Sequence, residues 1–184
     1  MPRILSTVTA IAIAVTLLAG QQPASAAAAT SHTFGISADA YVDQGQPDRN
    51  HGSWWDMFVS AKANAALWSY YKVDVSGLTA PVTSAKLRVY VHEGSADGPA
   101  VYSAASSWTS GGLTWNTRPQ PSGGASFDAG SVPSAADYDW DVTALVAGDG
   151  TYTFLLKDPN PTDGLNLRSR ESQQKPQLIV STQP

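Results

Sequence analysis

Apolar and polar residues alternate in a series of short runs along the chain. Every second residue from Ile36 to Val42 is apolar, and the run from Ala85 to Val91 has the cleanest alternation. Similar runs lie within residues 67–75, 137–142, 151–157 and 178–180. A period of two residues is typical of a β-strand with one buried face. Each run therefore predicts a strand.

The connections between these runs are rich in turn-forming residues. Glycine, proline, asparagine and aspartate recur at intervals too short for a long helix. Only residues 143–147 could form a single helical turn, which Gly148 would end. Many short strands with such connections are typical of two packed sheets. We therefore predict an all-β fold, a jelly-roll-like antiparallel β-sandwich.

The first residues have the features of a secretory signal peptide. Arg3 precedes an apolar run from Ile4 to Gly20, and small residues follow at positions 24–26. We predict that residues 1–26 are removed by cleavage and that the mature protein is secreted and extracellular. Residues 27–35 are mostly small or polar and are expected to be a flexible lead-in. Residues 36–184 are expected to form a single domain.

Composition narrows the class of partner. The chain has 15 acidic residues against 11 lysines and arginines, a net charge of −4, which argues against a general nucleic-acid binder. Beyond the predicted signal peptide, no run is long and apolar enough to insert into a membrane. The sequence has no cysteine, so disulfides and thiolate metal sites are excluded. The fold must be stabilised by its core and its hydrogen bonds.

A short signature lies within residues 108–119, where Thr114, Trp115 and Asn116 are followed by Pro119. It resembles the signature of DNRLRE domains, also called carbohydrate-binding module family 96. Further segments agree with that family in the same order along the chain. They are residues 38–43, 72–78, 85–90, 141–143, 164–167, 169–171 and 176–180.

The resemblance covers residues 36–181 and implies an extracellular jelly-roll module. Members of this family bind acidic polysaccharides such as alginate, often beside catalytic domains. The expected partner is therefore a polysaccharide or cell-wall glycan. The sequence departs from the family pattern at Trp54 and Trp55, where the family usually has a plainer polar loop. We assign structural roles to the motif residues Trp108, Thr114, Trp115, Asn116, Pro119, Arg170 and Glu171.

The first candidate ligand surface combines aromatic and basic residues of two successive predicted strands. Trp68, Tyr70 and Lys72 lie on the face of one strand opposite its apolar residues. On the next strand, the corresponding face carries Lys86, Arg88, Tyr90 and His92. If these strands pair as a hairpin, aromatic plates lie beside cations, as an acidic sugar requires. The alternatives are a second buried layer under loops or an ordinary solvated face.

A second candidate is the loop that contains Trp54 and Trp55. Adjacent residues on an extended chain point to opposite sides, so at most one of the two is easily buried. An exposed tryptophan is unfavourable unless it is used for a contact. We therefore keep this loop as an alternative ligand-contact site.

Structural calcium is the only cofactor that the sequence brings into question. Asp39, Asp43, Asp48 and Asn50 provide oxygen ligands of the kind that calcium takes, although their spacing does not match an EF-hand. Solvated turn residues are the competing interpretation.

The acidic residues of the run 137–141 are expected to pair with a cation such as Arg168 or Arg170.

Catalysis finds little support in the sequence. The three histidines are scattered, and the chain has neither a Gly-x-Ser-x-Gly elbow nor a histidine pair with zinc spacing. Glu93 beside His92 is the one adjacent acid and base near the first candidate surface. We therefore expect a non-catalytic carbohydrate-binding protein that favours acidic polysaccharides. The alternatives are a structural or adhesive cell-surface protein and a small glycan lyase or hydrolase.

Overall fold

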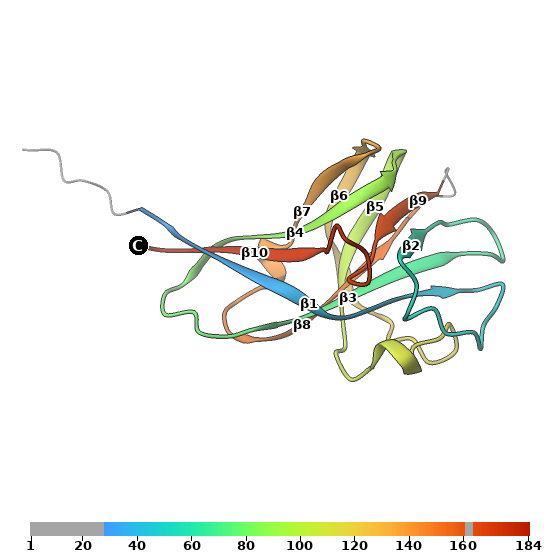
Figure 1. The fold of residues 1–184 in the computed structure, drawn as a ribbon, viewed down its shortest axis with the longest axis horizontal. Coiled ribbons are helices and arrows are strands. Elements are labelled where there is room, and N and C mark those ends of the chain that lie inside the picture. Colours follow the sequence, from blue (N-terminus) through green and yellow to red (C-terminus); the bar gives the residue numbers. More distant parts are fainter. Residues whose placement is uncertain (1–27, 161–163) are drawn as a thin grey trace, which may run out of the picture.

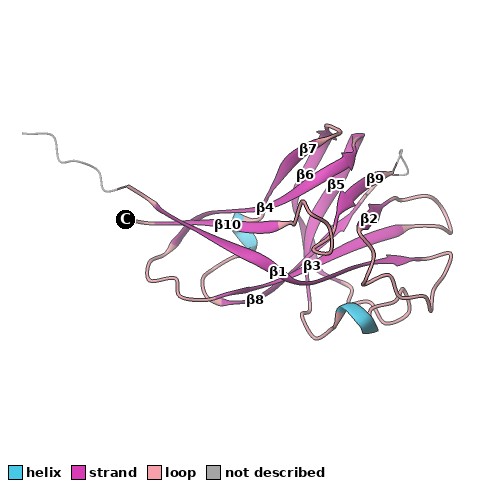
Figure 2. Cartoon of the chain, in the orientation of Figure 1, coloured by secondary structure: helices cyan, strands magenta, loops and turns pink. Residues whose placement is uncertain are grey.

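A computed structural model describes residues 28–160 and 164–184, so the predicted signal peptide lies outside the described residues. The described chain consists of strands joined by turns and two short 3₁₀ helices, which lie in connecting segments (Figure 2). The strands are β1 (Thr30–Asp43), β2 (Asp56–Val59), β3 (Leu67–Val75), β4 (Val82–Glu93), β5 (Ser95–Ala104), β6 (Pro121–Val132), β7 (Ala136–Asp141), β8 (Gly150–Lys157), β9 (Leu165–Arg168) and β10 (Gln177–Thr182). The 3₁₀ helices are η1 (Ser110–Gly112) and η2 (Thr143–Leu145).

The strands form two antiparallel layers that share β1. Residues 30–35 of β1 pair with β10, and the rest of the strand pairs with β3 (Figure 1). In the first layer, β10 also pairs with β4, which pairs in turn with β7 and β9, and β2 flanks β9. In the second layer, the order is β1, β3, β8, β5 and β6. This arrangement confirms the predicted antiparallel β-sandwich.

The main core lies between the two layers. Alternate residues of β4, from Ala85 to Val91, are fully buried and face Tyr71, Val73 and Phe154 of the other layer. Trp140 of β7 is also fully buried and closes this core. Burying one such large apolar side chain contributes about 1.5–3 kcal/mol, which explains how the chain folds without a disulfide.

The structure corrects the prediction of a flexible lead-in. From Thr30 onward, the backbone is a strand hydrogen-bonded to β10, and Phe34 packs against the main core. Polar side chains concealed this strand because its pairing uses backbone groups, which every residue carries. The sequence also gave no clear signal for four strands. Of these, β2 and β9 have only four residues each, and β5 and β6 contain several small residues.

A second, smaller core lies on the outer face of the β1–β3–β8 layer. The segment 105–120 crosses this face and places Trp108 and Leu113 against it. Beneath them lie the buried residues Ala38, Ala40, Val42, Trp68, Tyr70 and Leu155. Trp108 also donates a hydrogen bond from Nε1 to Thr153 Oγ1 at 3.1 Å. The second layer is therefore apolar on both faces.

The second core yields a prediction about stability. Replacing Trp108 by alanine removes a large buried side chain and leaves Thr153 without this donor, so we expect a loss of about 3–5 kcal/mol in the free energy of unfolding. Urea denaturation followed by far-ultraviolet circular dichroism measures it. A Trp108→Ala protein as stable as the parent would contradict the role of the second core.

Candidate functional site

Two adjacent tryptophans project from the segment that leads into β2. Trp54 is 40% exposed and Trp55 is 67% exposed. No other large apolar side chain among the described residues is exposed. An exposed pair of this size costs hydration free energy, which is recovered when a ligand covers it. The pair is therefore the starting point of the candidate site.

Aromatic packing fixes the ring of Trp54. The centroid of its ring lies 5.8 Å from that of Tyr41 and 5.1 Å from that of His51, and both contacts are T-shaped. The rings of Tyr41 and His51 stack on each other, with their centroids 4.1 Å apart. The Arg49 guanidinium lies 5.3 Å from the Trp54 ring centroid. His51 is buried, and this burial lowers its pKa, so it remains a neutral packing element at neutral pH.

The signature segment anchors the loop that carries the tryptophans. The Asn116 backbone N–H donates to the Pro47 carbonyl at 3.1 Å, and Asn116 Nδ2 donates to Asp48 Oδ1 at 2.8 Å. In the opposite direction, Asn50 Nδ2 donates to the carbonyls of Ser110 and Leu113 at 2.6 and 2.7 Å. These four hydrogen bonds join residues 44–55 to the cover of the second core.

Gly52 shows how closely the two segments approach each other. A Cβ atom at this position would lie 2.0 Å from the backbone oxygen of Ser110, so no larger residue fits without moving the backbone. The glycine thus permits the contact that the asparagines hold.

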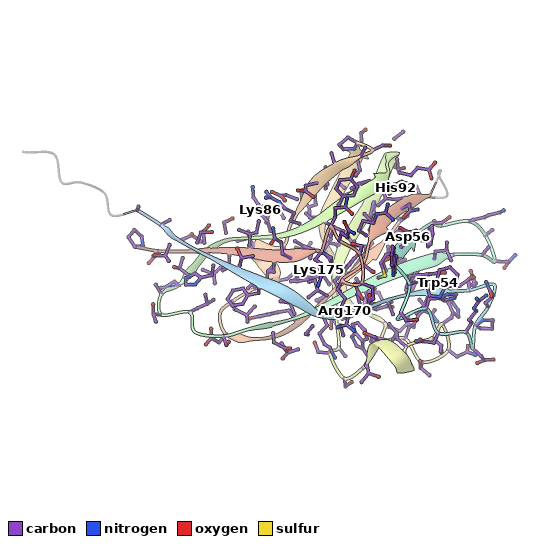
Figure 3. All side chains as sticks on the ribbon, in the orientation of Figure 1. Trp54, Asp56, Lys86, His92, Arg170 and Lys175 are labelled. Atoms are coloured by element: carbon purple, nitrogen blue, oxygen red, sulfur yellow. The ribbon has the colours of Figure 1, made fainter. Side chains whose placement is uncertain are left out.

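Two arginines flank the backbone partner of Trp55. The Ser169 N–H donates to the Trp55 carbonyl at 3.0 Å, which places Arg168 and Arg170 on either side of this contact. Arg168 forms an ion pair with Asp56, and its Nη2 lies 3.2 Å from His92 Nδ1. Trp54, Asp56 and His92 lie along the same region of the molecule in Figure 3.

Arg170 belongs to a cluster of charged groups below this surface. The buried carboxyl group of Asp39 accepts a hydrogen bond from the Arg170 backbone N–H at 2.7 Å, and its other oxygen lies 3.6 Å from Arg170 Nε. The same Nε lies 3.0 Å from Glu171 Oε1. Burial, more than the neighbouring Glu171 charge, raises the pKa of Asp39 to about 7.

The prediction that Trp68 and Tyr70 form an exposed pair is wrong. Trp68 is 9% exposed and Tyr70 is fully buried, because the segment 105–120 covers their face of β3. The Tyr70 hydroxyl donates to the Pro119 carbonyl at 2.8 Å, and Trp68 contacts Trp115 at 5.1 Å between ring centroids. The alternative of a second buried layer describes this face.

Arg118 is a residue of this layer that sequence reasoning missed. Its guanidinium lies 3.6 Å from the Trp115 ring centroid and 4.7 Å from that of Trp68. Burial lowers the pKa of Arg118, which nonetheless remains a cation at neutral pH. Its position directly before Pro119 of the signature was the available signal. Arg118 therefore stabilises the cover by stacking.

The predicted hairpin between the third and fourth strands does not exist. β3 pairs with β1 and β8, whereas β4 lies in the other layer and pairs with β10, β7 and β9. The two faces that the prediction joined therefore lie on opposite outer sides of the sandwich. Lys72 donates to the carbonyls of Ser106 and Trp108 in the cover of the second core. The remaining predicted residues, on the other side, are Lys86, Arg88, Tyr90 and His92.

An ion-pair network occupies much of that other face. Arg88 Nε lies 2.7 Å from Asp139 Oδ1, and Lys86 Nζ lies 3.9 Å from Asp139 Oδ2. Asp139 of β7 therefore pairs with cations of the neighbouring strand β4. The prediction that it pairs with a cation such as Arg168 or Arg170 is wrong. The carboxylates that those arginines approach are Asp56 for Arg168, and Asp39 and Glu171 for Arg170.

The four candidate calcium ligands have separate protein partners. Asp39 accepts from Arg170, Asp43 accepts from Gly45 and Gln46, and Asp48 accepts from Asn116. Asn50 is a donor to the signature segment. Within residues 28–160 and 164–184, no group of three or more histidine or acidic side chains could hold a metal ion. The structure does not bring the four side chains together as the calcium hypothesis requires.

The motif residues occupy the cover and the charged cluster. Trp108 is buried in the second core, Trp115 packs at its edge, and Asn116 reaches the tryptophan loop. The Thr114 N–H donates to Thr117 Oγ1 at 2.9 Å, which tightens the turn between them. Arg170 and Glu171 pair with each other beside Asp39. The sequence offered no signal for the role of His51 or Arg49 beneath Trp54.

The fold and this surface define a class, a β-sandwich with two exposed aromatic residues on an anchored loop. The sequence model of carbohydrate-binding module family 96 matches residues 30–182, and the chain belongs to this family. The partner of the module is therefore a glycan, and the resemblance read from the signature is confirmed. No curated protein matches the chain significantly. No helix among the described residues is long and apolar enough to span a membrane.

The buried carboxyl group of Asp39 predicts a pH dependence of stability. Its ordinary pKa is 3.8, so in the interval from 3.8 to about 7 the folded protein holds a proton that the unfolded chain releases. The contribution of Asp39 to the free energy of unfolding therefore falls as pH rises through this interval.

Asparagine at this position keeps an acceptor for the Arg170 N–H but cannot ionise. We expect Asp39→Asn to lose less stability than the parent between pH 4 and pH 7, measured by urea denaturation at several pH values. Comparison with the parent cancels the opposite contribution of His51, whose pKa is lowered. Parallel pH profiles for the two proteins would contradict a raised pKa at Asp39.

Proposed function

We propose that this chain is a secreted, non-catalytic module that binds an acidic polysaccharide, an alginate-like or other uronate glycan, through Trp54 and Trp55. The observation that carries the proposal is the exposure of two tryptophans on an anchored loop of a carbohydrate-binding module. A sugar ring has an apolar C–H face that stacks on an indole, and its hydroxyls need polar groups nearby. The arrangement supplies both.

Anchoring of the loop supports its role in binding. The asparagine hydrogen bonds and the stack of Tyr41 and His51 hold the backbone and the Trp54 ring in place before a ligand arrives. A preorganised surface loses less conformational entropy on binding than a mobile loop does. Tyr41 and His51 thus act beneath the contact surface and not within it.

The preference for an acidic glycan rests on the cations around the tryptophans. Arg49 lies against Trp54, and Arg168 and Arg170 flank the Trp55 contact. A net charge of −4 for the whole chain does not oppose this preference, because a ligand responds to the local field. Asp56 and Glu171 partly offset the arginines, so we expect a moderate salt dependence.

A non-catalytic role is supported by the arrangement of His92 and Glu93, the adjacent base and acid near the site. His92 Nδ1 is in contact with Arg168, and Glu93 follows on a strand where neighbours point apart.

Secretion is supported by the charged, apolar and small-residue pattern of residues 1–26.

Substitution of the tryptophans tests the proposed surface. We expect Trp55→Ala to weaken binding to alginate oligosaccharides by about five- to a hundredfold, which corresponds to about 1–3 kcal/mol for an aromatic contact. Isothermal titration calorimetry measures the affinity. Trp54→Ala should act in the same direction.

Tyr90→Ala provides the matched control, because Tyr90 is an aromatic residue on the outer face of β4. This variant should bind like the parent. If Tyr90→Ala loses affinity while Trp55→Ala keeps it, the binding surface is the β4 face and the proposal is wrong.

A further inference from the structure

A pocket of about 340 Å³ opens beside the paired side chains of Arg170 and Glu171. It is lined by Gly35, Ile36, Arg170, Glu171, Lys175 and Pro176. Its position follows from the topology, because β1 leaves β10 for β3 at residues 35 and 36 while the connection from β9 to β10 passes beside it. Gly35 borders open space, because a Cβ there would have no neighbour within 4 Å.

The pocket contains cationic groups that the protein does not fully engage. Arg170 approaches Asp39 and Glu171 with Nε, and its terminal guanidinium nitrogens form no hydrogen bond with a described residue. Lys175 is exposed, and its ammonium group has no such partner among the described residues either. Both side chains line this pocket, and both are labelled in Figure 3.

The charge balance in the pocket favours an anion. Glu171 is the only carboxylate of the lining and pairs with Arg170, whereas the Asp39 carboxyl group near Arg170 is buried and is not part of the lining. Lys175 is therefore a cation without a counter-charge at the pocket. A guanidinium with a free edge next to an ammonium group is an arrangement that binds carboxylates, and the planar fork of arginine suits their two oxygens.

A backbone hydrogen bond links the segment that lines the pocket to the tryptophan loop. Ser169, whose N–H donates to the Trp55 carbonyl at 3.0 Å, immediately precedes Arg170 in the chain. A glycan that stacks on Trp55 therefore needs to extend only past this contact to reach the pocket. Few residues separate the two, and the Asp39 hydrogen bond to the Arg170 N–H fixes the backbone between them.

We infer that the pocket of Arg170 and Lys175 is a carboxylate subsite, which takes a uronate group of the same glycan chain that stacks on Trp55. This assignment rests on the function proposed above and adds the group that distinguishes acidic from neutral sugars. Trp55 supplies a contact that any pyranose ring can make, whereas Lys175 contacts only the acid. Selectivity and stacking thus reside in different residues.

The test compares Lys175→Ala with Lys62→Ala, which removes the same charge from an exposed lysine in the connection between β2 and β3. The ligands are alginate oligosaccharides and their carboxyl-reduced, neutral counterparts. We expect Lys175→Ala to bind the acidic oligosaccharide about three- to tenfold more weakly than the parent, and the neutral one equally well. Lys62→Ala should bind both like the parent.

Four outcomes would contradict the assignment, and they separate it from the proposed function. If Trp55→Ala loses binding but Lys175→Ala does not, the subsite is wrong and the stacking surface stands. If Lys175→Ala weakens both ligands equally, the lysine does not read the carboxylate. If a sulfated galactan binds more tightly than alginate and loses more affinity with Lys175→Ala, the subsite takes sulfate esters instead. If Trp55→Ala keeps full affinity, the proposed function itself fails.

Discussion

The outer face of the β1–β3–β8 layer is apolar and has to be covered. Ala40, Val42, Tyr70 and Leu155 on this face are fully buried, and leaving them in water would forfeit a large part of the hydrophobic free energy of folding. Residues 105–120 provide the cover. Because the same segment hydrogen-bonds to residues 44–55 through Asn50 and Asn116, the cover also determines where Trp54 and Trp55 lie. Stability of the second core and the geometry of the candidate binding surface are therefore linked.

Local alternation identified the core-facing side of the predicted strands but not the environment of their other side. Val73 and Leu87 could be assigned to the main core because a strand with one buried face repeats every two residues. The same pattern placed Trp68 and Tyr70 opposite that core, which is correct, yet it contained no information about a distant segment that covers them. Whether the second face of a strand is wet depends on contacts between residues far apart in the sequence, such as Tyr70 and Pro119.

The pairing of the strands was the other feature that could not be predicted from the sequence. Lys72 and Lys86 belong to consecutive strands, and their separation onto opposite sides of the sandwich follows only from the pairing of β3 with β8 and of β4 with β10. The loop of Trp54 and Trp55 could be recognised because two adjacent large apolar residues among polar ones need an explanation. Its anchoring by the signature could not, since Asn116 and Asp48 are 68 positions apart. The resemblance located the signature, and the structure explains what its asparagine does.

The central claim is that a glycan contacts Trp54 and Trp55 while the other tryptophans serve the two cores. Indole N–H resonances in a nitrogen-15 correlation spectrum report on all six tryptophans of the chain at once. During titration with alginate oligosaccharides, the resonances of Trp54 and Trp55 should shift with a common dissociation constant, and those of the buried Trp68, Trp108 and Trp140 should stay in place. Shifts confined to the buried tryptophans, with Trp54 and Trp55 unchanged, would contradict this account.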